Sequence, residues 1–183
     1  MSIYSPDDDS FLLSDIVKKE IKKLIINTSN LKILDMGSGS GIQAKTAIDA
    51  GANPKKITLS DISSEAIKFL KENFTKSKII KSNLFEKIKG KFDLIIFNPP
   101  YLPEDKREPK DSKLATTGGK KGDEMIIKFL KQAKPHLTQD GKILILTSSL
   151  TPKINFKKLG YNSEIIAKKK LFFEELKVLV LSL

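Results

Sequence analysis

The feature that most constrains this chain is the pattern of a buried strand that ends in two prolines. The run from Phe92 to Phe97 is apolar except for Asp93, which is typical of a central strand covered on both faces. Asn98-Pro99-Pro100-Tyr101 follows at once. Proline cannot donate to a sheet ladder, and it biases the residue before it away from the helical region. The sequence therefore predicts a stiff, extended turn at the carboxyl edge of a sheet, where open α/β sheets bind their ligands.

This turn has the chemistry to hold a planar NH2 group. Its prolines leave nearby carbonyls with few donors, Asn98 adds an amide oxygen, and Tyr101 adds a flat ring. Two acceptors would bind the two hydrogens of an NH2 group while the ring covers its face. A rigid turn with no function beyond the fold is the plain alternative, and the tetrapeptide by itself does not decide between the two.

Length and composition exclude several kinds of site. The chain has 183 residues, of which 39% are hydrophobic, and this predicts one domain over residues 1–183 with a substantial core. It has no cysteine and a single histidine, His136, so we expect no disulfide and no cysteine- or histidine-based metal site. No apolar run approaches the roughly 20 residues of a membrane span, and the acidic start has no signal-peptide shape. A cytoplasmic protein is expected.

The net charge of +11 raises the question of nucleic-acid binding. Arg107 is the single arginine among 33 basic residues, whereas base recognition depends largely on the planar fork of arginine. Lysines spread over helices favour a solvated surface. The best support for a nucleic-acid footprint is a group of six lysines, namely Lys153, Lys157, Lys158, Lys168, Lys169 and Lys170.

Hydrophobic periodicity and capping residues predict alternating strands and helices. Helices are expected over residues 9–26, 42–51, 65–74 and 123–134, with a short one capped by Thr151, and strands over 31–35, 57–61, 78–81, 92–97, 142–147, 162–168 and 176–183. Such alternation with a final pair of strands predicts an α/β fold in which helices cover both faces of a mostly parallel sheet. The stretch from Leu102 to Gly122 has no periodicity, and it is a candidate lid or substrate clamp.

A glycine-rich turn joins the first strand to the helix after it. Asp35 is followed by Gly37, Gly39 and Gly41, and Asp61 ends the second strand, where a carboxylate can accept from two ribose hydroxyls. The glycines also fit a dinucleotide fingerprint, or simple close packing of helix on strand. An acid at position 35 would repel a pyrophosphate but can serve the ammonium of S-adenosylmethionine. The turn thus resembles motif I of methyltransferases.

Together these motifs resemble the short HemK-like methyltransferases, the archaeal and eukaryotic branch that methylates release-factor glutamine. The segments that carry the resemblance are Tyr4-x-Pro6-x-x-Asp9-Ser10-Phe11-Leu12-Leu13, the glycine turn, Asn98 to Tyr101, Gly118-Gly119-x-x-Gly122-x-Glu124, Ser148 to Thr151 and Lys169 to Leu176. They span nearly the whole chain. The resemblance implies a Rossmann-like class I fold with a seven-stranded sheet of order 3-2-1-4-5-7-6 and an antiparallel last strand. We do not expect the additional N-terminal helical domain of the longer bacterial type.

The resemblance also implies where ligands lie. The cofactor S-adenosylmethionine would be lined by Ser10, Asp35, Gly37, Gly39, Gly41, Asp61, Asn83, Leu84 and Asn98, and the substrate amide would be held by Asn98, Pro99, Pro100 and Tyr101. Asn83 departs from the usual Asp of the family. Its neutral oxygen is a weaker acceptor for the adenine amino group, so either cofactor affinity is lower or a neighbour orients this side chain. The implied reaction is in-line methyl transfer to the amide of a glutamine in a GGQ-type loop, without a general base.

Two partners are implied as well. One is the release factor itself, and the other is a small zinc-binding activator that pairs with the edge strand over Lys78 to Ser82. A short strand flanked by lysines is equally how an edge avoids pairing. Two other functions stay open. The same cradle would hold an adenine flipped out of DNA or RNA for N6-methylation, or the chain would be a non-catalytic cofactor-binding scaffold.

Overall fold

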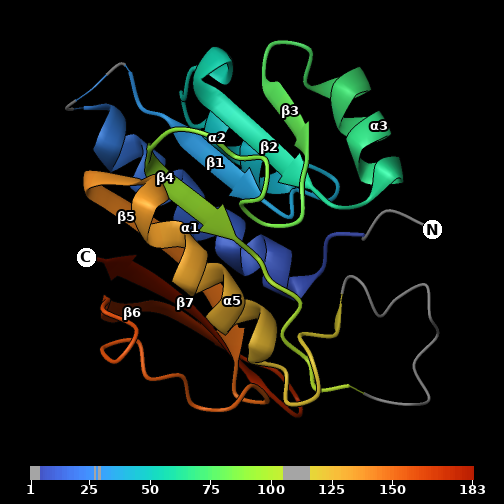
Figure 1. Ribbon diagram of the computed structural model, residues 1–183, viewed down its shortest axis with the longest axis vertical. Coiled ribbons are helices and arrows are strands. Elements are labelled where there is room, and N and C mark those ends of the chain that lie inside the picture. The colour runs from blue at the N-terminus through green and yellow to red at the C-terminus, as the bar shows by residue number, and fades with distance from the viewer. Residues whose placement is uncertain (1–4, 27, 29, 105–115) are drawn as a thin grey trace.

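One mixed sheet organises the molecule. The computed structural model describes residues 5–26, 28, 30–104 and 116–183 (Figure 1). Within this part of the chain, seven strands lie in the order β3-β2-β1-β4-β5-β7-β6. Their bounds are β1 Ile33–Met36, β2 Ile57–Asp61, β3 Lys78–Lys81, β4 Phe92–Phe97, β5 Leu137–Ser148, β6 Asn162–Lys170 and β7 Glu175–Ser182. The pairings from β3 to β5 are parallel and β7 is antiparallel to both neighbours, which confirms the predicted order and the antiparallel last strand.

Helices cover both faces of the sheet. Their bounds are α1 Asp8–Ile25, α2 Ile42–Asp49, α3 Ser64–Asn73 and α5 Glu124–Ala133, with short 3-10 turns at Pro54–Lys56 and Lys134–His136. Apolar side chains of α1, α2 and α3 pack on one face, and those of α5 pack on the other. Figure 1 shows α5 in front of the sheet and α1 behind it. Alternate residues of each central strand therefore enter different cores, which explains why β1 and β4 read as nearly continuous apolar runs.

The first helix brings its amino-terminal end to the carboxyl edge of the sheet. Asp7 caps α1 by accepting from the amide of Asp8, and lysines occupy its last turn, as the helix dipole favours. Leu13, Val17 and Ile21 are fully buried on one stripe of the helix, which faces the core. In Figure 1 the arrowheads of β1, β2 and β4 point to the side where the chain enters α1.

Two sequence expectations differ from the structure. The fifth strand begins at Leu137 rather than Lys142, with an irregular register opposite residues 92–94 where Gly141 lies close to the Phe92 carbonyl. The expected short helix after Thr151 is wrong. Residues 152–155 have no helical structure, because the Thr151 hydroxyl donates to the carbonyl of Tyr101 at 3.1 Å instead of capping a helix. Of the candidate lid, residues 105–115 lie outside the described residues.

Candidate active site

A cavity lies at the carboxyl edge of the parallel strands. Its walls are the segments that follow β1, β2, β3 and β4, together with the first turn of α1 and Met125 of α5. This position is the usual ligand crevice of an open α/β sheet. The cavity brings together most of the residues that the sequence singled out, namely Ser10, Asp35, Gly37, Gly39, Asp61, Asn83, Leu84, Asn98, Pro99 and Pro100. Gly41 and Tyr101 do not line it.

The three glycines after β1 have different roles. Gly37, Gly39 and Gly41 all have positive φ, at 63°, 52° and 75°, a region that other residues adopt only with strain. A Cβ on Gly41 would overlap the ring of Phe74, so this glycine serves the close packing of α2 on α3. Gly37 and Gly39 line the cavity, and their bare backbone leaves room for a ligand. Close packing therefore accounts for Gly41, and cofactor binding stays a prediction for Gly37 and Gly39.

Asp61 ties the glycine turn to β2. One oxygen, Oδ2, accepts from the Gly39 amide at 2.8 Å, and the other, Oδ1, accepts from the Ser63 amide at 2.8 Å. Each carboxylate oxygen keeps a second lone pair, which leaves capacity for the hydroxyls of a ribose. Ile62, the next residue, lines the cavity with a side chain that is 45% exposed, and so offers an apolar surface beside the carboxylate.

Asp35 is a buried carboxyl at the base of the cavity. Burial raises its pKa from 3.8 to about 7, and the nearby charge of Asp61 adds to this effect. A hydrogen bond from the Ala44 amide, at 3.2 Å, acts in the opposite direction. A cation that bound beside Asp35 would favour its ionised form and lower the pKa. The site therefore suits a ligand that brings a positive charge.

Asn98 is held at one end of its amide and unpaired at the other. Its Nδ2 donates to Oδ2 of Asp9 at 3.1 Å and lies 3.5 Å from the Ser10 hydroxyl. Its Oδ1 is buried and has no hydrogen-bond partner among the described residues. An unpaired buried acceptor costs about 1–3 kcal/mol, so this oxygen favours a ligand that brings a donor. Asp9 was not among the predicted site residues, and its place beside Ser10 in the opening signature is the signal that could have found it.

Two residues after β3 complete the other end of the cavity. Asn83 donates from Nδ2 to Oε1 of Glu86 at 2.7 Å, so a neighbour orients its amide and holds its NH2, which leaves the side-chain oxygen as the acceptor for a ligand. This is one of the two consequences expected from the missing aspartate. Leu84 has φ of 48°, which is rare for a residue other than glycine, and the Ser82 hydroxyl holds its carbonyl at 2.8 Å. Backbone strain of this kind is concentrated at ligand sites.

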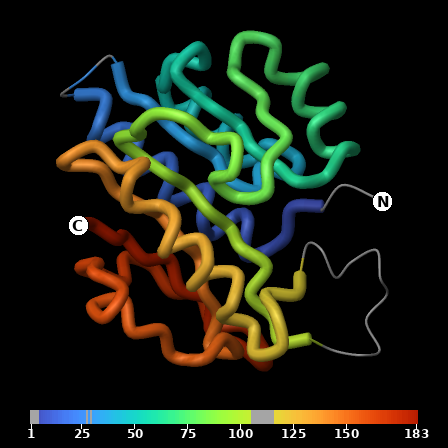
Figure 2. Tube along the Cα trace, viewed as in Figure 1, coloured from blue at the N-terminus to red at the C-terminus, as the bar shows by residue number. Residues whose placement is uncertain are grey.

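The glycine-rich segment after the undescribed residues forms a wall behind the Asn-Pro-Pro-Tyr turn. Leu102 donates to the Thr116 carbonyl at 2.9 Å, and Gly118 donates to the Leu102 carbonyl at 2.9 Å. A Cβ on Gly118 would lie 2.6 Å from the Pro100 carbonyl oxygen. Figure 2 shows residues 97–104 running beside residues 116–122. Glu124 closes this wall by accepting from the amides of residues 121 and 122, which gives the glycine and glutamate pattern a structural role.

Tyr101 helps to support the turn, and its expected place over a substrate stays a prediction. Its ring is partly buried and packs against both hydrophobic clusters, and its carbonyl accepts from Thr151. The sequence placed this ring over a substrate, but the cavity lining ends at Pro100.

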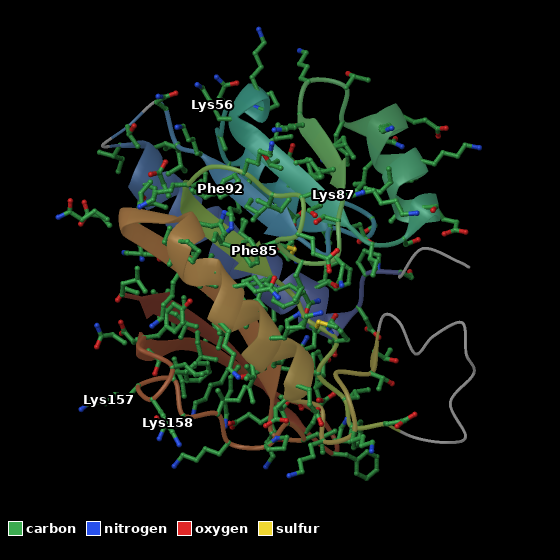
Figure 3. All side chains as sticks on the ribbon, in the orientation of Figure 1. Lys56, Phe85, Lys87, Phe92, Lys157 and Lys158 are labelled. Atoms are coloured by element: carbon green, nitrogen blue, oxygen red, sulfur yellow. The ribbon has the colours of Figure 1, made fainter. Side chains whose placement is uncertain are left out.

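The six lysines do not form one patch beside the cavity. Lys168 lies 3.8 Å from Glu175, and Lys169 pairs with Asp8 at 2.9 Å. Lys157 and Lys158 precede β6, and Figure 3 shows them pointing outward at the end of the molecule away from the cavity edge. The charge that best supported a nucleic-acid footprint is therefore divided between two ends of the sheet.

Two kinds of feature are absent from the described part of the chain. No group of three or more acidic, histidine or cysteine side chains there is arranged to hold a metal ion. No helix there is both long and apolar enough to cross a membrane.

The sheet order, the glycine turn after β1 and the acid at the tip of β2 together define the Rossmann-like fold of class I methyltransferases. The chain belongs to the methyltransferase small domain family, whose model matches residues 7–173.

Known relatives lie in the same group. The chain is 39% identical over 187 residues to a Methanocaldococcus jannaschii protein with the provisional name protein N5-glutamine methyltransferase, covering 97% of this chain and 90% of that one. It is 40% identical over 126 residues to a release factor glutamine methyltransferase of Borreliella burgdorferi, covering 62% of this chain and 43% of that protein. Among solved structures, a chain of the Mtq2-Trm112 complex of E. cuniculi matches with a TM-score of 0.72 at 19% identity, and the match covers 99% of this chain and 98% of that chain. That complex is responsible for the methylation of the translation termination factor eRF1.

Proposed function

We propose that this protein is an S-adenosylmethionine-dependent methyltransferase that acts on the side-chain amide of a glutamine in a peptide chain release factor, in a GGQ-type loop. The names of the relatives support the reaction class, and the cavity supports the acceptor. The observation that carries the proposal is the buried Oδ1 of Asn98, which lies beside the rigid proline turn and has no hydrogen-bond partner in the described part of the chain. The enzyme would act in the cytoplasm, where release factors meet the ribosome.

The residues present fit the cofactor. Asp35 would hold the methionine ammonium, because its buried carboxyl favours a cationic neighbour. Asp61 would accept from the ribose hydroxyls, and the Asn83 oxygen, oriented by Glu86, would accept from the adenine amino group. When bound, the cofactor supplies an electrophilic methyl group on a sulfonium.

The substrate half would supply position and charge stabilisation. An amide nitrogen is a poor nucleophile because its lone pair is delocalised, and positive charge develops on it as the methyl arrives. Oδ1 of Asn98 and the carbonyl of Pro99 would accept its two hydrogens, which stabilises that charge and fixes the nitrogen in line. Pro100 would keep the turn rigid, and Tyr101 would support it from the core side. No general base is proposed.

A protein partner is proposed at the free edge of the sheet. β3 is the edge strand of the described sheet, and its outer lysines, Lys78 and Lys81, are exposed. The structural neighbour from E. cuniculi is a complex with a second protein, Trm112. We propose that a small zinc-binding activator pairs with residues 78–82 by strand addition, which needs unpaired backbone groups at an edge.

The test is transfer of labelled methyl groups. The purified protein, with and without a candidate activator, would be offered a release factor, its Gln→Ala variant, and duplex and single-stranded DNA. Label on the release factor that disappears with the Gln→Ala change is the expected result. Label on DNA alone would overturn the proposal in favour of N6-adenine methylation. Cofactor binding without turnover on any of these substrates would favour the non-catalytic scaffold.

Asn98→Ala tests the assignment within the site. It should lower kcat by about 10²–10³-fold, as expected when a preorganised group at the reacting centre is lost. Cofactor affinity should change by less than about threefold, because the other cofactor contacts remain. Asn162→Ala, at an exposed asparagine at the start of β6, is the matched control and should leave both quantities unchanged. Equal loss of turnover and cofactor affinity in Asn98→Ala would contradict the assignment.

A further inference from the structure

The orientation of Asn98 is controlled from a distant part of the chain. Asp9, in the first turn of α1, is 89 residues away in sequence and only 6% exposed. Its Oδ2 accepts from Asn98, and its Oδ1 accepts from the amide of Ser10. We infer that Asp9 is a positioning residue for methyl transfer, whose carboxylate keeps the oxygen of the Asn98 amide, rather than its NH2, available to the substrate nitrogen. This inference rests on the proposed function.

An amide needs such a device because its two ends have nearly the same shape. With the amide of Asn98 reversed, its NH2 would meet the NH2 of the substrate, and two sets of donors would face each other. A carboxylate can only accept hydrogen bonds, so the reversed amide would also set its oxygen against an oxygen of Asp9. The Ser10 hydroxyl, 3.5 Å from Nδ2, can both donate and accept and so does not distinguish the two orientations. Discrimination therefore comes from Asp9.

The same geometry explains why the residue is an acid. Among its contacts with described residues, Asp9 accepts from two donors, the Ser10 amide and the Asn98 NH2, each on a different carboxylate oxygen. An asparagine at position 9 would have one oxygen for these two donors. If that oxygen stays with the Ser10 amide, the substituted side chain turns its own NH2 toward Asn98. Asn98 would then reverse to accept from it, and would present its NH2 to the substrate.

The first turn of α1 is fixed on two sides, so Asp9 has a defined position. On one side, the buried Gln43 of α2 donates to the Ser10 carbonyl at 2.9 Å and accepts from the Ser14 hydroxyl at 3.1 Å. On the other side, Lys169 of β6 pairs with Asp8 at 2.9 Å. A positioning group acts only if its own support is rigid. These contacts provide that support from elements on either side of the helix.

The experiment compares D9N and D9A in the full-length protein, with kcat, KM and cofactor Kd measured on the methyl acceptor that the wild-type protein labels. D9N should lower kcat by about 100-fold, because it stabilises the reversed amide, and D9A by only about tenfold, because Asn98 then loses both its fixed orientation and its fixed position without being held in the reversed orientation. A purely structural role predicts the opposite order, since asparagine is the closer match in shape. Cofactor Kd should change by less than about threefold in both variants.

A control and a double mutant complete the design. D7N makes the same chemical change at the exposed helix cap, where asparagine caps as well as aspartate, and should leave kcat within about twofold of wild type. D9A should lose its effect in an N98A background, because the group that it orients is gone. The double mutant distinguishes positioning from structural damage even if D9N does not fold, because structural damage from D9A would lower kcat equally in the wild-type and N98A backgrounds.

Failure of the inference is distinct from failure of the proposed function. If the wild-type protein labels no planar NH2 group, the proposed function fails. If it does label one, and D9A retains kcat within about twofold or D9N is milder than D9A, then Asp9 is not a positioning residue. An equal loss from D9A in the wild-type and N98A backgrounds would overturn the inference in the same way.

Discussion

The proposed cofactor half and the proposed substrate half of the cavity are built in different ways. The cofactor half uses backbone conformation, with glycines at positive φ after β1 and an acid at the tip of the neighbouring strand that accepts from Gly39, 22 residues earlier in the chain. The substrate half is assembled from elements far apart in sequence. Asn98 is held by Asp9, and Tyr101 is held by Thr151, 50 residues away. One half is thus a local motif and the other is a product of tertiary packing.

Because of this difference, we expect that cofactor binding and methyl transfer can be impaired separately by substitutions in the two halves. A change in the backbone of the glycine turn should weaken cofactor binding before it affects chemistry at a bound substrate. A change in the wall behind the proline turn should do the reverse, since that wall fixes the acceptor groups and none of the cofactor contacts. The following predictions test this separation, from the largest expected effect to the smallest.

Gly41→Ala should weaken cofactor binding by about 100-fold, which corresponds to about 2.7 kcal/mol. The new Cβ would overlap the Phe74 ring and would also have to adopt φ of 75°. Titration calorimetry measures the Kd. Gly90→Ala is the matched control, because Gly90 also has positive φ, at 91°, but has no heavy atom within 4 Å of the added carbon. Similar losses in the two variants would show that backbone strain anywhere in the fold, rather than the glycine turn, limits binding.

Gly118→Ala should lower kcat by about 10- to 100-fold and leave the cofactor Kd within about threefold of wild type. The added carbon would lie 2.6 Å from the Pro100 carbonyl oxygen, and would therefore displace the turn that presents Asn98. Steady-state kinetics on the methyl acceptor and a separate binding titration give the two values. A loss of cofactor affinity as large as the loss of kcat would contradict the proposed division of the cavity into a cofactor half and a substrate half.

Cofactor affinity should fall about tenfold per pH unit as the pH decreases below the pKa of Asp35, because one proton must leave before the cation binds. That pKa, about 7 in the folded protein, is above the ordinary 3.8, so ionised Asp35 is the major form only above about pH 7. Because the folded protein keeps this proton up to about pH 7 and the unfolded chain loses it near pH 3.8, the contribution of Asp35 to the free energy of unfolding falls as the pH rises from 3.8 toward 7. Binding titrations between pH 5.5 and 8 check the slope.

Asp35→Asn is the control for this pH series, and it also corrects for any titration of the cofactor itself. The variant should bind more weakly at pH 8 and should lose the part of the slope that belongs to Asp35. An unchanged slope in the variant would show that another group takes up the proton.

Lys169→Ala should have the smallest effect, lowering kcat by less than about threefold and the free energy of unfolding by less than about 1 kcal/mol. The Lys169–Asp8 pair is 42% and 47% exposed, so solvent screens it, and Gln43 still holds the other side of the α1 terminus. Thermal melts and kinetics measure both quantities. Lys45→Ala removes a more exposed ion pair, with Asp49 within α2, and is the control. If it lowered kcat as much as Lys169→Ala, support of α1 from β6 would have no part in catalysis.

Much of the fold could be predicted because its signals are local. The second strand occupies residues 57–61 as expected, and the Ser63 cap begins α3 one residue earlier than expected. Both the strand and the helix start depend on residues that are only a few positions apart in the sequence. The start of β5 could not be found in this way, because its first residues pair with β4 through an irregular register around Gly141. The expected cap at Thr151 was wrong for the same reason, since its hydroxyl has a partner in another element.

The sequence by itself determined the succession of strands and helices, the glycine turn and the identity of the groups at the carboxyl edge, whereas the strand order was implied by the resemblance to a known family. Apolar periodicity, glycine conformation and proline geometry are properties of short segments, and they act in the same way in any context. Only the tertiary structure decided how those groups point. The Asn98 amide has two ends of equal size, and the choice between them is made by Asp9, which the packing of α1 brings to within 3.1 Å. The orientation of Asn83 by Glu86 follows the same rule, because a hydrogen bond depends on distance and direction that spacing in sequence does not encode.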